Sequence, residues 1–251
     1  MNSKKNDVSC LLLESRKILC IQPHPDDMEI GAGGTIAMLS GKGAEITCLT
    51  VTDGSAGSRS PSDDPDQLAE RRRIEAEAGA SILGVNEMIW LDFTDGGYLP
   101  LEAVRGEITR AIRLVRPDTL MVCDPWLQYE AHSDHIRTGL AAAEAGFLSG
   151  LPNFHPADLQ DNIQPHTVEL IAFYYTSRPN TLIDVTSTWS LKIEAISCHK
   201  SQFSPGQGVD YITRLTEHAL KLGEKSGCKY TEAFKVLSRS QLHIFEAAEL
   251  E

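Results

Sequence analysis

Residues 17–27 read Lys17-Ile-Leu-Cys-Ile-Gln-Pro-His-Pro-Asp-Asp27, an apolar run that ends in an imidazole and two adjacent carboxylates. The apolar part is typical of a buried strand, and the run that begins at Ala32 is typical of a helix. In open α/β sheets, ligands bind just beyond the carboxyl ends of the strands. A histidine and two carboxylates at that position can bind a divalent metal and leave one carboxylate free as a base on a metal-bound water.

The alternation of strand and helix continues along the chain. Further strands are predicted at residues 44–51, 87–91 and 119–123, and helices at 32–41, 65–83, 101–115 and 135–149. This order predicts an α/β fold, a Rossmann-like three-layer sandwich in which helices cover both faces of a mostly parallel sheet.

The alternation of strands and helices stops after Gly150, where a long loop that contains several prolines is predicted to run to Pro165. Beyond it we predict strands at 168–175, 181–185 and 241–245, and helices at about 191–199 and 211–223. The chain contains no clean linker. We therefore predict one domain over residues 1–251, with a core at about 17–150 and an elaborated C-terminal third at about 151–246.

Composition narrows the class of protein. The net charge of −12 argues against nucleic acid or an anionic membrane surface as a partner, because both call for a basic face. Cys20, Cys48 and Cys123 lie in predicted strands, which indicates buried thiols rather than disulfides. The apolar stretch Cys10-Leu-Leu-Leu13 is too short for a signal peptide or a membrane span, so we expect a cytoplasmic enzyme.

A second polar cluster, His132-Ser-Asp-His135, follows the predicted strand at 119–123. Either cluster alone could be a polar turn or a capped helix start. If the two strands are neighbours where the strand order reverses, however, the clusters meet. His24, one of the two carboxylates and one histidine of the second cluster would then give three ligands and an open position for water, the pattern of catalytic zinc. Asp134 could fix the tautomer of a histidine.

Three further features allow more than one interpretation. Gly31-Ala-Gly-Gly34 lacks the spacing of a dinucleotide-binding motif, and a tight turn under a helix is the favoured interpretation. Arg72 lies on the apolar face of its predicted helix, where it could simply pair with Glu75. Asp53 and Asp95 follow predicted strands and precede glycine, so each is either a turn residue or an acceptor for sugar hydroxyls.

Together, these stretches resemble the LmbE-like (PIG-L) family of zinc-dependent N-deacetylases, and within it the archaeal-type diacetylchitobiose deacetylases. The resemblance runs from about residue 17 to 246. It is carried by Pro23-His-Pro-Asp-Asp27, Asp124-Pro-Trp-Leu-Gln-Tyr-Glu-Ala-His-Ser-Asp-His135, Leu151-Pro-Asn-Phe154, Tyr174-Tyr-Thr176, Arg178-Pro-Asn180 and His199-Lys-Ser-Gln-Phe203. The second motif of the family usually has proline where this chain has Ser133, which should only soften the helix start.

The resemblance implies a role for each candidate residue. His24, Asp27 and His135 would bind one Zn²⁺ per subunit, and Asp26 would be the general base. A positively charged His132 would polarise the carbonyl group, next to Asp134. The resemblance also implies a homo-oligomer, a hexamer or a trimer. Arg72 and Asp95 are expected at the substrate, and His243 is expected to reach a neighbouring subunit's site.

The activity implied is the removal of the N-acetyl group from an N-acetylglucosamine-containing sugar such as diacetylchitobiose, as in chitin degradation, with release of acetate. The expected partner is a small amino sugar, and neither nucleic acid nor a membrane. Two alternatives stay open. One is an amide hydrolase of the same family that acts on another N-acetylglucosamine conjugate, such as a thiol-sugar or a glycolipid precursor. The other is a non-catalytic sugar-binding protein that contains a metal.

Overall fold

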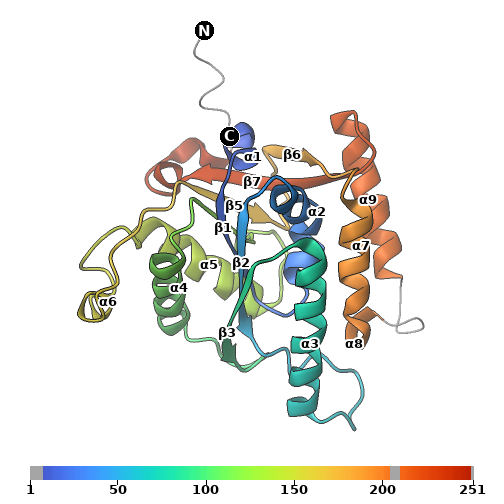
Figure 1. The fold of residues 1–251 in the computed structure, drawn as a ribbon, viewed down its shortest axis with the longest axis horizontal. Coiled ribbons are helices and arrows are strands. Elements are labelled where there is room, and N and C mark those ends of the chain that lie inside the picture. Colours follow the sequence, from blue (N-terminus) through green and yellow to red (C-terminus); the bar gives the residue numbers. More distant parts are fainter. Residues whose placement is uncertain (1–7, 204–209, 250–251) are drawn as a thin grey trace.

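A seven-stranded sheet lies between two layers of helices in the computed structural model, which describes residues 8–203 and 210–249 (Figure 1). The strand order is β3-β2-β1-β4-β5-β7-β6. Strands β1 to β5 pair in parallel, and β7 is antiparallel to β5 and β6, so the predicted mostly parallel α/β sheet is confirmed. The strands are β1 (Lys17–Gln22), β2 (Glu45–Thr52), β3 (Glu87–Phe93), β4 (Thr119–Cys123), β5 (Leu170–Tyr174), β6 (Thr181–Asp184) and β7 (Thr231–Ser238).

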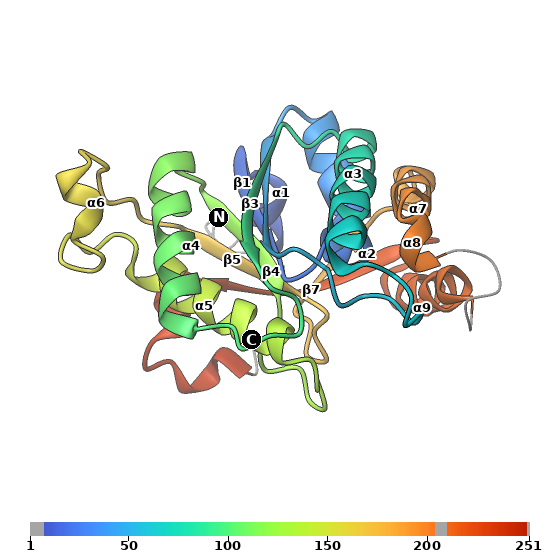
Figure 2. The same ribbon diagram turned by 90° about the horizontal axis from the view of Figure 1, so that it is seen from below.

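Helices cover the two faces of the sheet, as Figure 2 shows. One face carries α2 (Asp27–Gly41), α3 (Pro65–Leu83), α7 (Trp189–Cys198) and α9 (Tyr211–Ser226), and the other carries α4 (Leu101–Val115) and α5 (Ser133–Leu148). The remaining helices are short: α1 (Val8–Leu13), α6 (Ala157–Gln160), α8 (Lys200–Phe203) and the 3-10 helices η2 (Arg239–Leu242) and η3 (Glu246–Glu249). In the part of the chain described, no helix combines the length and apolar character needed to cross a membrane.

The pairing of β1 with β4 brings the two polar clusters to one edge of the sheet. Ile18 is in register with Thr119, and Cys20 with Met121. The strand order reverses here, because the chain runs from β1 to β2 on one side and from β4 to β5 on the other. The predicted adjacency of these strands is confirmed, and the crevice of an open α/β sheet is expected at this point.

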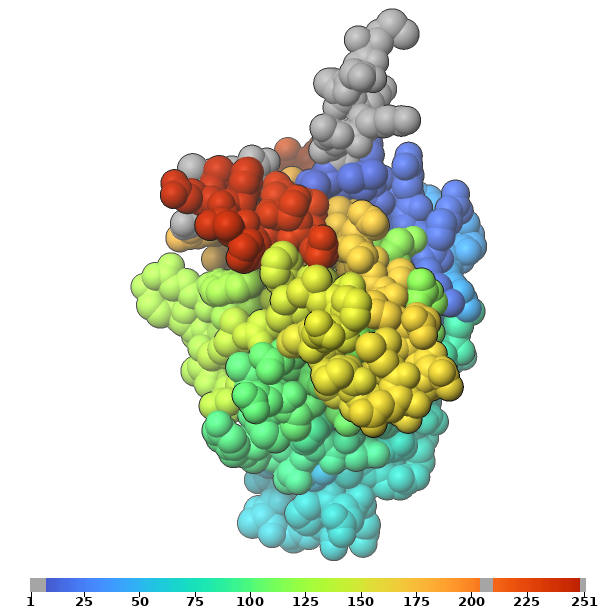
Figure 3. Space-filling model, turned by 90° about the vertical axis from the view of Figure 1, so that its left-hand side faces the viewer, coloured from blue at the N-terminus to red at the C-terminus, as the bar shows by residue number. Residues whose placement is uncertain are grey.

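The elaborated C-terminal part packs against the core through a buried arginine. Segment 151–169 (yellow) lies against α4 (green) in Figure 3. The side chain of Arg113 is 2% exposed and donates to four backbone carbonyl groups, and it forms a 2.9 Å ion pair with Asp158. Asp158 also accepts from Arg110 at 3.1 Å. The long loop is therefore held by charged hydrogen bonds and contains the short helix α6.

Two predictions about local structure are wrong. The last strand is β7, at Thr231–Ser238, whereas the predicted strand at 241–245 begins within η2 and continues to Ile244, which is 90% exposed with φ 52°. The glycines of the 31–34 motif lie inside α2, which begins at Asp27, and do not form a turn. They allow close packing, because a Cβ atom at Gly31 would lie 2.3 Å from the Tyr174 ring and one at Gly34 would lie 2.8 Å from Cβ of Val185.

A buried ion pair ties α2, α7 and β7 together. Glu232 of β7 accepts hydrogen bonds from the backbone N–H groups of Gly34 and Thr35 at 2.9 and 2.8 Å, and it pairs with Lys192 of α7. Lys192 is 1% exposed and Glu232 is 4% exposed. An uncompensated charge at this depth is costly, so each partner depends on the other.

We expect Glu232→Gln to lower the free energy of unfolding by about 3–5 kcal/mol, because the variant leaves the Lys192 ammonium buried without a counter-charge. The matched control is Glu45→Gln, which breaks an exposed ion pair with Lys17 and should change the free energy by less than about 1 kcal/mol. Urea denaturation measures both values. Equal effects of the two substitutions would contradict the structural role assigned to Glu232.

Candidate functional site

The two polar clusters meet at the carboxyl ends of β1 and β4. His24 lies in the short loop between β1 and α2, and His132 and His135 lie at the start of α5. The centroid of the His24 ring is 4.5 Å from that of His132 and 5.2 Å from that of His135. Residues separated by more than a hundred positions in sequence thus form one site, as predicted.

His24, Asp27 and His135 form a set that can hold a metal ion, with ligand atoms within 4.8 Å of one another. The Oδ2 atom of Asp27 is 3.2 Å from Nδ1 of His24 and 3.4 Å from Nε2 of His135. Such separations suit ligand atoms around one ion with bonds of about 2.0–2.2 Å. Two imidazole nitrogens and one carboxylate are also a donor set that zinc accepts, so these residues fit a divalent metal.

Each member of this set contacts a second polar group. His24 Nε2 lies 3.2 Å from Asp95 Oδ1 and 3.5 Å from Asp134 Oδ2. His135 Nδ1 lies 3.5 Å from Glu130 Oε2. The Tyr175 hydroxyl donates to Asp27 Oδ1 at 3.3 Å. Carboxylates and hydroxyls behind metal ligands orient the ligands and fix which nitrogen faces the metal.

His24, Asp95, His132 and Asp134 are a second group whose ligand atoms lie within 4.8 Å of one another. Asp95 also accepts from the backbone N–H of Ala56 at 3.2 Å, and Asp134 from that of Gly96 at 3.1 Å. Burial alone would lower the pKa of His24, but hydrogen bonds that its ring donates to the carboxylates of Asp134, Asp27 and Asp95 raise it well above its usual value. We interpret Asp95 and Asp134 as the groups that hold the ring of His24.

Asp26 lines the same cavity as Asp27 and His135 and is paired with Arg72. Its Oδ2 atom is 3.2 Å from Nη2 of Arg72, whereas Asp27 faces the histidines, so the two adjacent carboxylates have different partners. Burial raises the pKa of Asp26 to about 6, although Arg72 opposes the shift. Asp26 also has φ 153° and ψ −18°, a backbone conformation that L-residues rarely adopt. The site thus contains a buried carboxylate that is not needed as a ligand.

Arg72 is 3% exposed, and its hydrogen bonds are with other groups of the protein. Besides Asp26, it donates to the carbonyl groups of Pro25 at 3.3 Å and Gly54 at 3.0 Å. A Cβ atom at Gly57 would lie 2.3 Å from Nη1 of Arg72, so the loop after β2 closes directly over the guanidinium. The alternative pair with Glu75 does not form. Glu75 instead accepts from the backbone and the hydroxyl of Ser201.

The remaining predicted residues lie as follows. Asp95 is 8% exposed, and its oxygens contact His24, Ala56 and Arg72. His243 is exposed and stacks on Phe147, with ring centroids 5.1 Å apart. Phe147 is twelve residues beyond His135 on α5, or about 18 Å along the helix at ~1.5 Å per residue. His243 therefore lies outside this chain's own site.

His132 is exposed at the N-cap position of α5. Its backbone N–H donates to Glu130 Oε1 at 2.7 Å. Partial burial lowers the pKa of His132, and the neighbouring His24 and His135 lower it further. In the metal-free protein the pKa of His132 is therefore below its usual value, and the positive charge that the resemblance implies stays a prediction.

Glu130 and Tyr175 also belong to the site, although no role was predicted for either of them from the sequence. Both lie within stretches that carry the family resemblance, and a carboxylate close to a ligand histidine is the signal that could have identified Glu130. They also line an open cavity of about 620 Å³ above the site. Its walls include Asp26, Asp27, Ile30, Arg59, Leu127, His135, Thr176, Gln202, Phe203 and Tyr211. The space is large enough for a small organic ligand.

Comparisons with known proteins agree on one group of relatives. The family model described as PIG-L, GlcNAc-PI de-N-acetylase, matches residues 19–146. Diacetylchitobiose deacetylase of Thermococcus kodakarensis is 38% identical over 97% of this chain and 89% of that protein. The solved structure of N,N'-diacetylchitobiose deacetylase from Pyrococcus horikoshii, complexed with its inhibitor MPG, has a TM-score of 0.94 and 39% identity over 98% of this chain and 93% of that one.

A more distant relative is similar over a shorter stretch. The 1D-myo-inositol 2-acetamido-2-deoxy-alpha-D-glucopyranoside deacetylase of Kineococcus radiotolerans is 32% identical over 54% of this chain and 46% of that protein.

We expect Glu130→Gln to weaken Zn²⁺ binding by about 10–100-fold, because the amide no longer stabilises the proton on Nδ1 of His135. Glu144→Gln is the matched control, since Glu144 lies on α5 and pairs with Arg105 near the surface. Competition with a chromogenic chelator measures the affinity of each variant. Equal affinities of the two variants would show that Glu130 does not support the metal ligands.

We expect Arg72→Met to raise the pKa of Asp26 above about 6 in the metal-free protein, because the guanidinium lowers the pKa of that carboxyl group. The same change at Arg73, which pairs with Asp92 nearer the surface, is the control and should have no effect. NMR titration of the Asp26 carboxyl carbon measures the midpoint. An unchanged midpoint in the Arg72 variant would contradict this electrostatic role.

Proposed function

Because the chain belongs to the PIG-L family of de-N-acetylases, we propose that it hydrolyses the N-acetyl group of an N-acetylglucosamine-containing sugar such as diacetylchitobiose. The observation that carries this proposal is that two adjacent carboxylates have different partners. Asp27 faces His24 and His135, whereas Asp26 faces Arg72 and is left over as a base. A site that held a metal for structure alone would have no use for a buried, strained carboxylate beside its ligands.

The proposed cofactor is one Zn²⁺ ion per subunit, held by His24, Asp27 and His135. A zinc ion there would polarise a water molecule and the acetamide carbonyl group. Asp26 accepts the proton of the attacking water. With a pKa of about 6, Asp26 is ionised at neutral pH and still basic enough for this transfer.

His132 is the proposed hydrogen-bond donor to the carbonyl oxygen. A neutral imidazole can donate an N–H hydrogen bond to the carbonyl oxygen as negative charge develops on it. This is the role of a donor in an oxyanion site. Asp134 and Asp95 hold the neighbouring ring of His24, and Arg72 holds Asp26. When the C–N bond breaks, the proton taken up by Asp26 is available to the leaving amine, and the products are acetate and an amino sugar.

Several parts of the proposal rest on the family resemblance. The contacts of Arg72 and Asp95 with the sugar are proposed on the resemblance alone. The same holds for an oligomer in which His243 reaches a neighbour's site. A second candidate substrate is an N-acetylglucosamine linked to inositol, which the name of the Kineococcus radiotolerans relative supports. In either case the chemistry is hydrolysis of the same acetamide.

We expect zinc-loaded protein to release acetate from diacetylchitobiose or N-acetylglucosamine, and chelation to stop the release. Asp26→Asn should lower kcat by about 10²–10⁴-fold with zinc still bound, because the general base is lost. Asp92→Asn, a change at a carboxylate that pairs with Arg73 away from the site, should leave the rate unchanged. An assay of released acetate measures these rates, and the inositol conjugate is tested separately as a third substrate.

Absence of acetate from all three substrates, with zinc shown to be bound, would overturn the proposed activity. Full activity of the Asp26→Asn variant would instead leave the activity standing and remove Asp26 from its role as base.

A further inference from the structure

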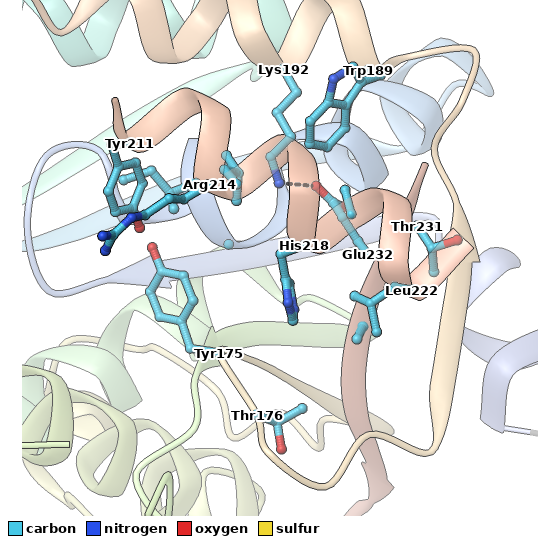
Figure 4. Close-up of a pocket in the computed structure, with 15 residues that line it drawn as sticks. Tyr175, Thr176, Trp189, Lys192, Tyr211, Arg214, His218, Leu222, Thr231 and Glu232 are labelled. Atoms are coloured by element: carbon cyan, nitrogen blue, oxygen red, sulfur yellow. Dashed lines mark hydrogen bonds and ion pairs between the residues drawn. The ribbon is translucent and has the colours of Figure 1, made fainter. Parts of the chain in front are cut away.

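A second cavity, of about 290 Å³, lies beside the candidate site between α2, α7, α9 and β7 (Figure 4). Ile30, Tyr175, Thr176 and Tyr211 line this cavity and also line the larger one that contains Asp26, Asp27 and His135. The two spaces are therefore adjacent, with Tyr175 and Tyr211 at their shared boundary. The volume lies near the lower end of the range of small-ligand sites, roughly 300–1,000 Å³.

The walls of this second cavity are mainly apolar. Trp189 is 7% exposed and Ala219 is 3% exposed, and the half-buried side chains of Leu215 and Leu222 face the same space from α9. Leu215, Ala219 and Leu222 recur at intervals of four and three residues, so they share one face of α9. This face is only partly covered by the sheet, and a ligand with an aliphatic body would complete its burial.

Lys192, Glu232 and Thr231 in the cavity wall are already paired with other groups of the protein, whereas Arg214 and His218 line the cavity from exposed positions on α9. Lys192 and Glu232 pair with each other, as Figure 4 shows, and Glu232 also accepts from Gly34 and Thr35. The hydroxyl of Thr231 is 2.7 Å from that of Ser226 and 2.8 Å from the Cys228 sulfur. Burial lowers the pKa of His218, and nearby lysines add to the effect, which favours a neutral ring. The paired groups offer little to the hydroxyl groups of a sugar, and an aliphatic chain needs none of them.

We propose that this cavity receives the aliphatic chain of an N-acyl group longer than acetyl, so that the protein also removes such acyl groups from glucosamine. The inference rests on the proposed function. In a trans amide, the acyl chain and the sugar extend from opposite sides of the C–N bond. Asp95, which we expect on the sugar side, is close to Nε2 of His24. Tyr175 lies toward the other nitrogen of the same ring, because it contacts Asp27, and Asp27 is close to Nδ1 of His24. An acyl chain that leaves past Tyr175 enters the second cavity.

The chemistry is the same hydrolysis with a larger acyl group. The oxygen of water bonds to the acyl carbon, the C–N bond breaks, and the nitrogen takes a proton. The products are an aliphatic carboxylate and glucosamine, and no reactant other than water is needed. Each methylene group that enters the cavity should improve binding by roughly a factor of four.

The test compares N-acetyl-, N-butyryl- and N-hexanoylglucosamine as substrates of the zinc-loaded protein. We expect KM to fall from acetyl to butyryl by roughly a factor of four per methylene. Leu222→Phe fills the cavity and should abolish this trend while acetate release persists. Leu220→Phe is the matched control, because Leu220 is two residues away on α9, 37% exposed and outside the cavity lining, and it should keep the trend.

Each other outcome decides the question. Release of acetate without release of butyrate or hexanoate would overturn the acyl cavity and leave the proposed function standing. A chain-length trend that survives in Leu222→Phe would also overturn it. If that variant releases no acetate, Ala219→Val supplies the same test with a smaller change. Failure of these three substrates together with diacetylchitobiose and the inositol conjugate would overturn the proposed function, and this inference with it. If only diacetylchitobiose or the conjugate is hydrolysed, the same comparison is made with its N-butyryl and N-hexanoyl forms.

Discussion

The parallel pairing of β1 with β4 is the interaction on which the site depends. It joins the start of the core to a segment about a hundred residues later, and it brings two loops to the same edge of the sheet. Neither loop contains all three of the proposed metal ligands, since His24 and Asp27 follow β1 and His135 follows β4. The hydrogen bonds of the sheet therefore set the distances on which the chemistry depends. A slip of one residue in this register would turn the strand's side chains to the other face.

Around this edge, the protein neutralises each buried charge locally. Arg72 lies between Asp26 and the loop after β2, His24 lies among three carboxylates, and Lys192 is paired with Glu232. Pairs of this kind are weak sources of stability, because desolvation offsets their attraction. They do specify geometry, since each charged group tolerates few alternative positions. In this protein the charged groups behind the ligands define the shape of the site, and the apolar core supplies the stability.

The sequence predicts those parts of the fold that are determined locally. Helix α3 has the predicted bounds because Asp64 caps it, Pro65 begins it and Gly84 ends it with φ 76°. Strand β7 was missed because Glu232 interrupts its apolar pattern, and its partner Lys192 lies forty residues away on α7. The meeting of the two polar clusters follows from their positions at strand ends, and the family resemblance supplies the predicted ligands His24, Asp27 and His135. The contacts of Glu130 and Tyr175 follow from neither, because they depend on how loops pack across the sheet.

The backbone of Asp26 has a wider consequence. A glycine would adopt its φ of 153° at little cost, whereas an aspartate is held there only by its surroundings. The residue that suits the fold at this point differs from the residue that the proposed reaction needs. Selection for a more rugged protein and selection for a working one thus pull position 26 in different directions, and drift toward stability alone would end in an inert relative with the same architecture.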